Sequence, residues 1–148
     1  MAELVIRKME LDDIEQVMIV EKASFATPWN AAIFNQEITD NRHAHYFIIE
    51  VDKSIVGYAG IWIVMDDAQI TNIAVLPSYR GMKLGEKLFQ YTLQFAVKMG
   101  VTRLSLEVRE SNVVAKKMYS KFGLVPGGIR KNYYTDNQED ALVMWVNL

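Results

Sequence analysis

The feature that most constrains the fold is a change of hydrophobic pattern in the middle of the chain. Residues 46–51, 55–64 and 69–76 are rich in β-branched and aromatic side chains, and short polar turns separate them. Such short connections join antiparallel strands, because a parallel pair needs a crossover of a dozen or more residues. The sequence therefore predicts an antiparallel meander of three strands, closed by Pro77.

A loop that contains glycine follows the meander and leads into a strongly amphipathic segment. Its apolar side chains recur with helical period: Leu84, Leu88, Tyr91, Phe95 and Met99. This spacing predicts a long helix with one buried stripe. Gly100 is well placed to end that helix.

The flanking segments complete a mixed pattern. Before the meander, a strand at 4–6 precedes a helix after Asp12 and Asp13, a break at 25–29, and a helix capped by Asn30. After the long helix come a strand at 103–109, a helix begun by Ser111 or Asn112, and two long strands at 124–134 and 141–148. The predicted order is β-α-α-β-β-β-α-β-α-β-β, which is typical of an α+β or mixed-sheet α/β fold.

Composition narrows the classes of function. The 148 residues match one domain, 1–148, with 51% hydrophobic and 23% charged residues. The net charge of −2 argues against direct nucleic-acid binding. The absence of cysteine excludes disulfides, cysteine-ligated zinc and a thiol nucleophile.

The same residues bear on location. Charges at Glu3, Arg7 and Lys8 interrupt any signal-peptide core, and the apolar run at 55–65 is too short to cross a bilayer. We therefore expect a cytoplasmic protein without a membrane partner.

The loop before the long helix is a candidate anion site. A helix N-terminus leaves main-chain N–H groups unpaired and carries a partial positive charge. Gly81 and Gly85 would let a pyrophosphate approach the main chain, while Arg80 and Lys83 add charge. The spacing is neither a P-loop nor a GxGxxG fingerprint. An ordinary strand-to-helix loop, with glycines that serve only the turn, is the alternative.

Two motifs together resemble the Gcn5-related N-acetyltransferase (GNAT) family. In place of the family's [RQ]-x-x-G-x-[GA], the loop reads Arg80-x-x-Lys83-x-Gly85. In place of its N-x-x-A-x-x-x-Y-x-x-x-G-F, the next helix reads Asn112-x-x-Ala115-x-x-x-Tyr119-x-x-x-Gly123-Leu124. The resemblance implies a twisted, mostly antiparallel sheet of about seven strands with about four helices on its two faces. It also implies acetyl-CoA as cosubstrate, and no metal.

Within the family, the chain resembles the RimI type, which acetylates the N-terminal alanine of a small-subunit ribosomal protein. The similarity extends from about residue 25 to about residue 144. Its segments are PW at 28–29, NIAV at 72–75, LEVRESN at 106–112, RKNYY at 130–134, EDA at 139–141, and Met144. The resemblance implies that the N-terminus of a ribosomal protein is the partner.

The resemblance also assigns roles in catalysis. It makes Glu107 the general base that removes the proton of the amine, although an outward-facing strand position would explain the residue alone. Tyr119 becomes the general acid, since a phenol is protonated at neutral pH; core packing is the alternative. Because no cysteine can carry an acyl group, we expect direct transfer within a ternary complex; an acyl group carried by a serine or lysine is the alternative.

Binding residues follow from the same comparison. The cosubstrate is assigned to main-chain atoms of the third meander strand, to the loop, and to the start of the 112–123 helix: Ile73, Ala74, Val75, Arg80, Gly81, Met82, Lys83, Leu84, Gly85, Glu86 and Asn112. Tyr133 and Tyr134 would line the peptide groove, with Trp29 and Asp140 as further candidates. Helix capping by Asn112 and hairpin packing of the tyrosines are the alternatives.

Two other functions stay open from the sequence. The acceptor could be a protein lysine or a small amine, because acceptor sites vary on a shared fold. Proton arithmetic favours an α-amine: its pKa near 8 leaves roughly a tenth deprotonated at neutral pH, against under one in a thousand for lysine. A non-catalytic acetyl-CoA-binding module is the third possibility. His43 and His45 lack an evident third metal ligand and are assigned to a loop and strand start.

Overall fold

The structure is a computed structural model that describes residues 3–148. Within them lie seven strands: β1 (Leu4–Lys8), β2 (Ala44–Val51), β3 (Ser54–Val64), β4 (Asp67–Val75), β5 (Arg103–Arg109), β6 (Val125–Arg130) and β7 (Ala141–Asn147). The helices are α1 (Ile14–Ser24), α2 (Ala31–Thr39), α3 (Leu84–Lys98) and α4 (Val113–Lys121), with short 3-10 turns η1 (Leu11–Asp13) and η2 (Pro77–Tyr79). This confirms the predicted order of strands and helices.

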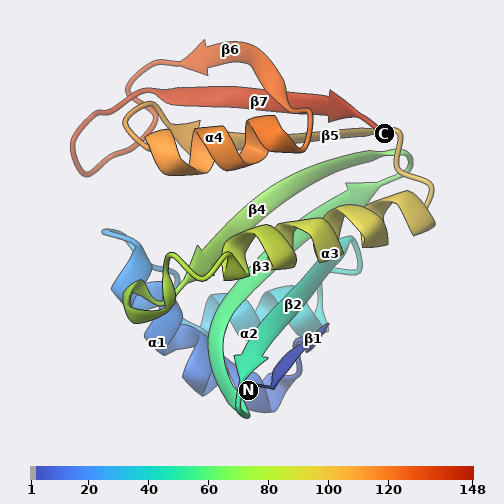
Figure 1. Ribbon diagram of the computed structural model, residues 1–148, viewed down its shortest axis with the longest axis vertical. Helices are drawn as coiled ribbons and strands as arrows, with labels where there is room; N and C mark the ends of the chain where they lie inside the picture. Colours follow the sequence, from blue (N-terminus) through green and yellow to red (C-terminus); the bar gives the residue numbers. More distant parts are fainter. Residues whose placement is uncertain (1–2) are drawn as a thin grey trace.

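All seven strands form one sheet in the order β1-β2-β3-β4-β5-β7-β6. Within the group β1 to β4 each strand is antiparallel to the next, and the same holds within the group β5, β7 and β6. Only the contact between β4 and β5 is parallel among the described residues. The mixed, mostly antiparallel sheet is therefore as predicted, and Figure 1 shows β5, β6, β7 and α4 at one end of it.

The parallel pair β4–β5 is short and then diverges. Pairing covers only residues 67–69 of β4 against 103–105 of β5. Beyond this point β5 stays paired with β7 as far as Arg109, while β4 continues along β3 to Val75. Figure 1 shows β4 and β5 running apart from a common end. One edge of β4 is thus left without a neighbouring strand.

The helices cover the two faces of the sheet. A large core lies between the sheet and the pair α3 and α4, and it includes Phe89, Leu106 and Tyr119. A smaller core lies under α1 and α2 on the other face and includes Phe34 and Tyr58. The predicted distribution of helices over both faces is confirmed.

The buried stripe of α3 differs in part from the predicted one. Leu84 and Leu88 are buried as expected, and Tyr91 and Phe95 are half-buried beside the core. Met99, predicted to close the stripe, is 50% exposed because α3 ends at Lys98. None of the helices within residues 3–148 is long and apolar enough to cross a membrane.

Candidate active site

The connection between β4 and α3 forms the predicted loop. Gly81 has a φ of 85° and Lys83 a φ of 59°, so both adopt the left-handed conformation. The Arg80 Nε donates to the Val75 carbonyl at 3.2 Å, which folds this side chain back onto the end of β4. Lys83 precedes α3 without a side-chain cap, so the first N–H groups of the helix stay available to a ligand.

The free edge of β4 presents main-chain groups beside this loop. The Leu76 N–H donates to the Val56 carbonyl at 2.8 Å, which sets the hydrogen-bonding phase of β4 against β3. In an antiparallel ladder, alternate residues direct both main-chain groups toward the partner strand. Ala74 therefore bonds to β3, and the main-chain groups of Ile73 and Val75 point toward the side from which β5 has diverged.

This phase corrects one predicted role. A main-chain contact was expected from Ala74, but its N–H and C=O face β3 and its side chain is buried under α1 and α2. The side chains of Ile73 and Val75 pack on the α3 side. The main-chain contacts available at this edge thus belong to Ile73 and Val75.

Glu107 lies in the middle of β5, on the face opposite Leu106 and Val108. Its side chain is only 11% exposed, so it is not the fully solvated strand position of the alternative interpretation. The Arg130 Nε lies 3.2 Å from the Glu107 Oε1. A hydrogen bond with Glu107 is the largest cause that raises the pKa of Tyr133. The carboxylate is therefore enclosed, paired with Arg130, and next to the predicted acceptor residue Tyr133.

Tyr119 lies on α4 in the large core. Its ring packs against Phe89 with centroids 5.0 Å apart, and only 5% of the residue is exposed. Burial is the main cause that raises the pKa of Tyr119, and the proximity of Tyr134 adds to it. The hydroxyl is therefore held protonated at neutral pH, which suits a proton donor, while core packing accounts for the ring.

Asn112 occupies the cap position of α4. Its Oδ1 accepts a hydrogen bond from the Ala115 N–H at 3.1 Å, as the capping alternative predicted. This bond leaves the Asn112 side-chain amide as the group free to face a ligand.

Tyr133 and Tyr134 lie in the loop between β6 and β7, not in a strand. The predicted strand at 124–134 is wrong beyond Arg130, since Asn132 has a φ of 53° that breaks an extended run. Tyr134 lies near Glu107 in a half-buried position. Burial is the main cause that raises the pKa of Tyr134 to about 12, and the charge of Glu107 adds to it. The proximity of Tyr134 also raises the pKa of Tyr119, so Tyr134 lies near both predicted catalytic side chains.

The remaining acceptor candidates have structural partners. The Asp140 Oδ1 accepts from the Asn132 N–H at 2.9 Å and so helps to shape the β6–β7 loop. Trp29 is half-buried, and its ring lies 5.2 Å from that of Phe34. The main-chain N–H of Trp29 donates to the Glu21 Oε2 at 2.8 Å, which holds the α1–α2 connection against α1.

Sequence reasoning missed three features near these residues. Arg109 contacts the β6–β7 loop, and only its place two residues after Glu107 on one strand hinted at a role. Glu21 is a buried carboxylate on the apolar face of α1. A cavity of about 630 Å³ lies on the outer face of α4, lined by Val113, Lys116, Lys117, Ser120 and Lys121.

Metal ligation finds no support in the described part of the chain. No three His, Cys, Asp or Glu residues between 3 and 148 are grouped to hold an ion. The His45 ring packs at a tilt against the Phe95 ring with centroids 4.9 Å apart, and burial lowers the pKa of His45.

Comparison with known proteins assigns the family. The model of the acetyltransferase (GNAT) family matches residues 11–124. A Bacillus subtilis protein, provisionally named a ribosomal protein bS18-alanine N-acetyltransferase, is 55% identical over 97% of this chain and 95% of its own. The Escherichia coli K12 protein named for the same activity is 33% identical over 94% of each chain.

Solved structures agree. The crystal structure of the E. coli ribosomal-protein-S18-alanine N-acetyltransferase superposes with a TM-score of 0.90 at 31% identity, covering 98% of this chain and 94% of that one. Ard1 from Thermoplasma volcanium gives a TM-score of 0.88 at 26% identity, with coverage of 98% and 97%. The chain therefore belongs to the acetyltransferase (GNAT) family.

Proposed function

We propose that this acyltransferase moves the acetyl group of acetyl-CoA to the N-terminal alanine of ribosomal protein bS18. One observation carries the proposal: Glu107 and Tyr119 lie on opposite faces of the sheet where β4 and β5 diverge. Relatives in B. subtilis and E. coli are named for this activity. The reaction belongs to the cytoplasm, where ribosomal proteins are made.

The free edge of β4 and the start of α3 suit CoA. The amide groups of the pantetheine arm match the main-chain groups of Ile73 and the Val75 N–H, which point away from β3. A side chain at Gly85 would meet only ordinary contacts, with the Met118 sulfur 3.7 Å away, so packing alone does not demand glycine there. Glycine instead leaves room for a pyrophosphate at the helix N-terminus.

The loop completes this site. When bound, acetyl-CoA supplies the activated acetyl group. The side chains and main chain that would hold its phosphates and arm are those of the loop, the first turn of α3 and the α4 cap: Arg80, Gly81, Met82, Lys83, Leu84, Gly85, Glu86 and Asn112.

Glu107 acts as the general base. The ammonium of the incoming N-terminus must lose a proton before its nitrogen can attack, and a nearby carboxylate takes that proton directly or through one water. Arg130 and Tyr133 fix the orientation of the Glu107 carboxylate. An α-amine with a pKa near 8 asks less of this base than a lysine near 10.4.

Tyr119 acts as the general acid. Its raised pKa keeps the hydroxyl protonated, ready to donate to the thiolate that leaves. The absence of cysteine supports the proposal that the acetyl group passes directly to the amine within a ternary complex. Tyr134, which lies near both Glu107 and Tyr119, lines the acceptor side together with Tyr133 and Trp29. Asp140 supports that side through the loop.

Mass spectrometry with matched acceptors tests the proposal. The full chain is incubated with acetyl-CoA and a peptide that has the bS18 N-terminus, which begins with alanine. Controls are the same peptide with a blocked N-terminus and an internal lysine, and a polyamine. We expect acetylation of the free alanine only. Acetylation of lysine or polyamine with an untouched alanine would contradict the acceptor assignment, and no acetylation of any amine would indicate a binding module.

A further inference from the structure

We infer that Arg109 is a positioning residue that clamps the acceptor loop, residues 131–140, in the shape that a peptide N-terminus requires. This inference rests on the proposed function, because it assigns a task to the loop that carries Tyr133 and Tyr134. Arg109 itself touches neither reacting group; it acts through the loop.

The guanidinium of Arg109 holds the far part of the loop by ion pairs. Its Nη2 lies 3.0 Å from both carboxylate oxygens of Asp136. Its Nη1 donates to the Glu139 Oε1 and to the Asn137 Oδ1, each at 3.3 Å. The contact with Glu139 is partly buried, with 28% of the Arg109 side chain and 17% of the Glu139 side chain exposed, while the contacts with Asp136 and Asn137 are exposed. A planar fork with fixed donors suits such a multi-point contact better than a lysine.

The same guanidinium holds the near part of the loop. It lies 4.0 Å from the centroid of the Tyr134 ring, which is a close cation–π contact. The Tyr134 N–H donates to the Glu139 carbonyl at 3.2 Å, so the two ends of the loop are also joined to each other. Arg109 thus packs between the tyrosine and the acidic end of one closed loop.

The loop buries few side chains of its own. Residues 131–138 are polar or exposed apart from Tyr134, and Asn132 and Gln138 both have left-handed φ values, of 53° and 60°. Three main-chain N–H groups add further anchors: that of Ser111 donates to the Glu139 Oε2 at 2.6 Å, that of Asn132 to the Asp140 Oδ1 at 2.9 Å, and that of Glu110 to the Asp140 carbonyl at 3.1 Å. Left-handed residues other than glycine persist only where their surroundings hold them. We assign that holding chiefly to Arg109.

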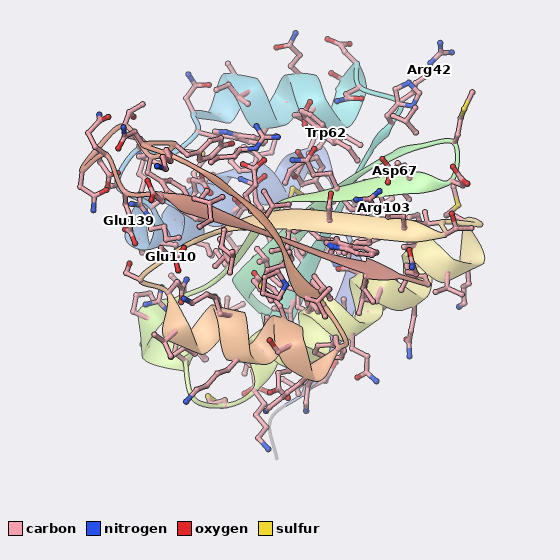
Figure 2. All side chains as sticks on the ribbon, turned by 90° about the horizontal axis from the view of Figure 1, so that it is seen from above. Arg42, Trp62, Asp67, Arg103, Glu110 and Glu139 are labelled. Atoms are coloured by element: carbon pink, nitrogen blue, oxygen red, sulfur yellow. The ribbon has the colours of Figure 1, made fainter. Side chains whose placement is uncertain are left out.

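The clamp is linked to the general base by one strand. Arg109 lies two residues after Glu107 on the same face of β5, a spacing of about 7 Å in an extended chain. Both residues pair with β7, the strand that the loop enters. Figure 2 shows Glu139 in this loop at the opposite end of β5 from Arg103. Loss of the clamp should therefore disturb the acceptor groove and leave the cosubstrate site intact.

The test replaces Arg109 by Gln, with Arg103→Gln as the matched control. Arg103 lies on the same strand and also makes a cation–π contact, 4.9 Å from the Trp145 ring, but it does not touch the loop. We expect Arg109→Gln to raise the KM for the alanine-starting peptide about tenfold or more, as loss of charge-assisted hydrogen bonds implies. The KM for acetyl-CoA should change less than about twofold. Arg109→Lys should fall between the wild type and Gln, since it keeps the charge and loses the fork.

Limited trypsin digestion gives a readout that does not depend on activity. Cleavage after the exposed Lys131, within the loop, should be several-fold faster in Arg109→Gln than in the wild type or in Arg103→Gln. Asp136→Asn removes the charge of one loop residue that binds Arg109. It should raise the peptide KM and the rate of cleavage after Lys131 to a smaller degree, and it serves as the test if Arg109→Gln does not fold.

Unchanged cleavage and unchanged peptide KM in a folded Arg109→Gln or Asp136→Asn protein would overturn the inference. Equal rises in the KM values for peptide and acetyl-CoA would also overturn it, because they indicate general damage. If the wild type does not acetylate the alanine peptide, the proposed function fails. The rate of trypsin cleavage then still tests whether Arg109 holds the loop.

Discussion

At the scale of single residues, Glu21 places a carboxyl group beside the apolar side chains of the smaller core. It is 1% exposed on the inner face of α1. The Tyr58 hydroxyl and the Trp29 N–H both donate to its carboxylate. Burial nevertheless outweighs these hydrogen bonds and raises the pKa of Glu21. Glu21 thus holds the end of the α1–α2 connection, and the ionised form of its carboxyl group is destabilised by burial.

This cost predicts a pH-dependent effect of Glu21→Gln. Because the folded pKa is above the unfolded value of 4.5, the wild type loses stability as pH rises above 4.5 and through the folded pKa. Each unit by which the pKa is raised corresponds to about 1.4 kcal/mol. Glutamine keeps the shape and does not ionise, so the free energy of unfolding of the variant relative to wild type should increase between pH 4 and pH 8. Urea unfolding at the two pH values measures this. A relative stability that is constant, or that falls with pH, would contradict the assignment.

Single residues also show how far sequence can predict a site. Strand alternation placed Glu107 opposite Leu106, whereas the burial of Glu21 was not predicted. The partners of these carboxylates come from distant segments: Tyr58 is 37 residues from Glu21, and Arg130 lies on β6. Pairing of that kind depends on the packed sheet, so the local pattern could not reveal it.

At the scale of elements, the start of α3 explains a departure from the family motif. Lys83 has a φ of 59°, a conformation that glycine adopts freely and other residues adopt at a cost of about 1–2 kcal/mol. The family's glycine at this place therefore suits the backbone, and Lys83 accepts strain there. The helix still begins at Leu84, with its first N–H groups uncapped.

Two substitutions separate the strain at Lys83 from its charge. Lys83→Gly relieves about 1–2 kcal/mol of backbone strain but stabilises the unfolded chain through its entropy by about 0.5–1 kcal/mol, so the free energy of unfolding should rise by up to about 1.5 kcal/mol. Lys83→Ala keeps the strain and should give no such gain. Both variants lose the ammonium, so calorimetry should show the same loss of acetyl-CoA affinity in each, no more than about tenfold. A glycine variant less stable than the alanine variant would contradict this account.

Elements themselves were largely predictable, and the exceptions have physical causes. The type and order of strands and helices followed from hydrophobic period, glycine and proline. The strand predicted through Tyr134 stops at Arg130 because Asn132 turns and charged contacts with Arg109 define a loop. Long-range ion pairs decided this boundary, and they leave no local signature in the sequence.

At the scale of the whole molecule, the divergence of β4 and β5 defines the candidate site. It frees the main chain of Ile73 and Val75 on one strand and brings Glu107 to the opposite face from Tyr119. The sequence predicted a meander and a mixed sheet, but it could not predict where a parallel pair stops. That depends on β7 inserting between β5 and β6, a pairing set by the complete topology.

The central claim is that Glu107 supplies the base at this divergence. The most direct measurement is kcat for the alanine-starting peptide, at saturating acetyl-CoA, for Glu107→Gln, with Glu110→Gln as control. Glu110 follows β5 directly, and its carboxylate is exposed beside Lys116. We predict a fall of roughly 10²–10⁴-fold for Glu107→Gln with unchanged acetyl-CoA binding, and a change of less than about twofold for Glu110→Gln. A kcat of Glu107→Gln within about twofold of the wild type would contradict the account.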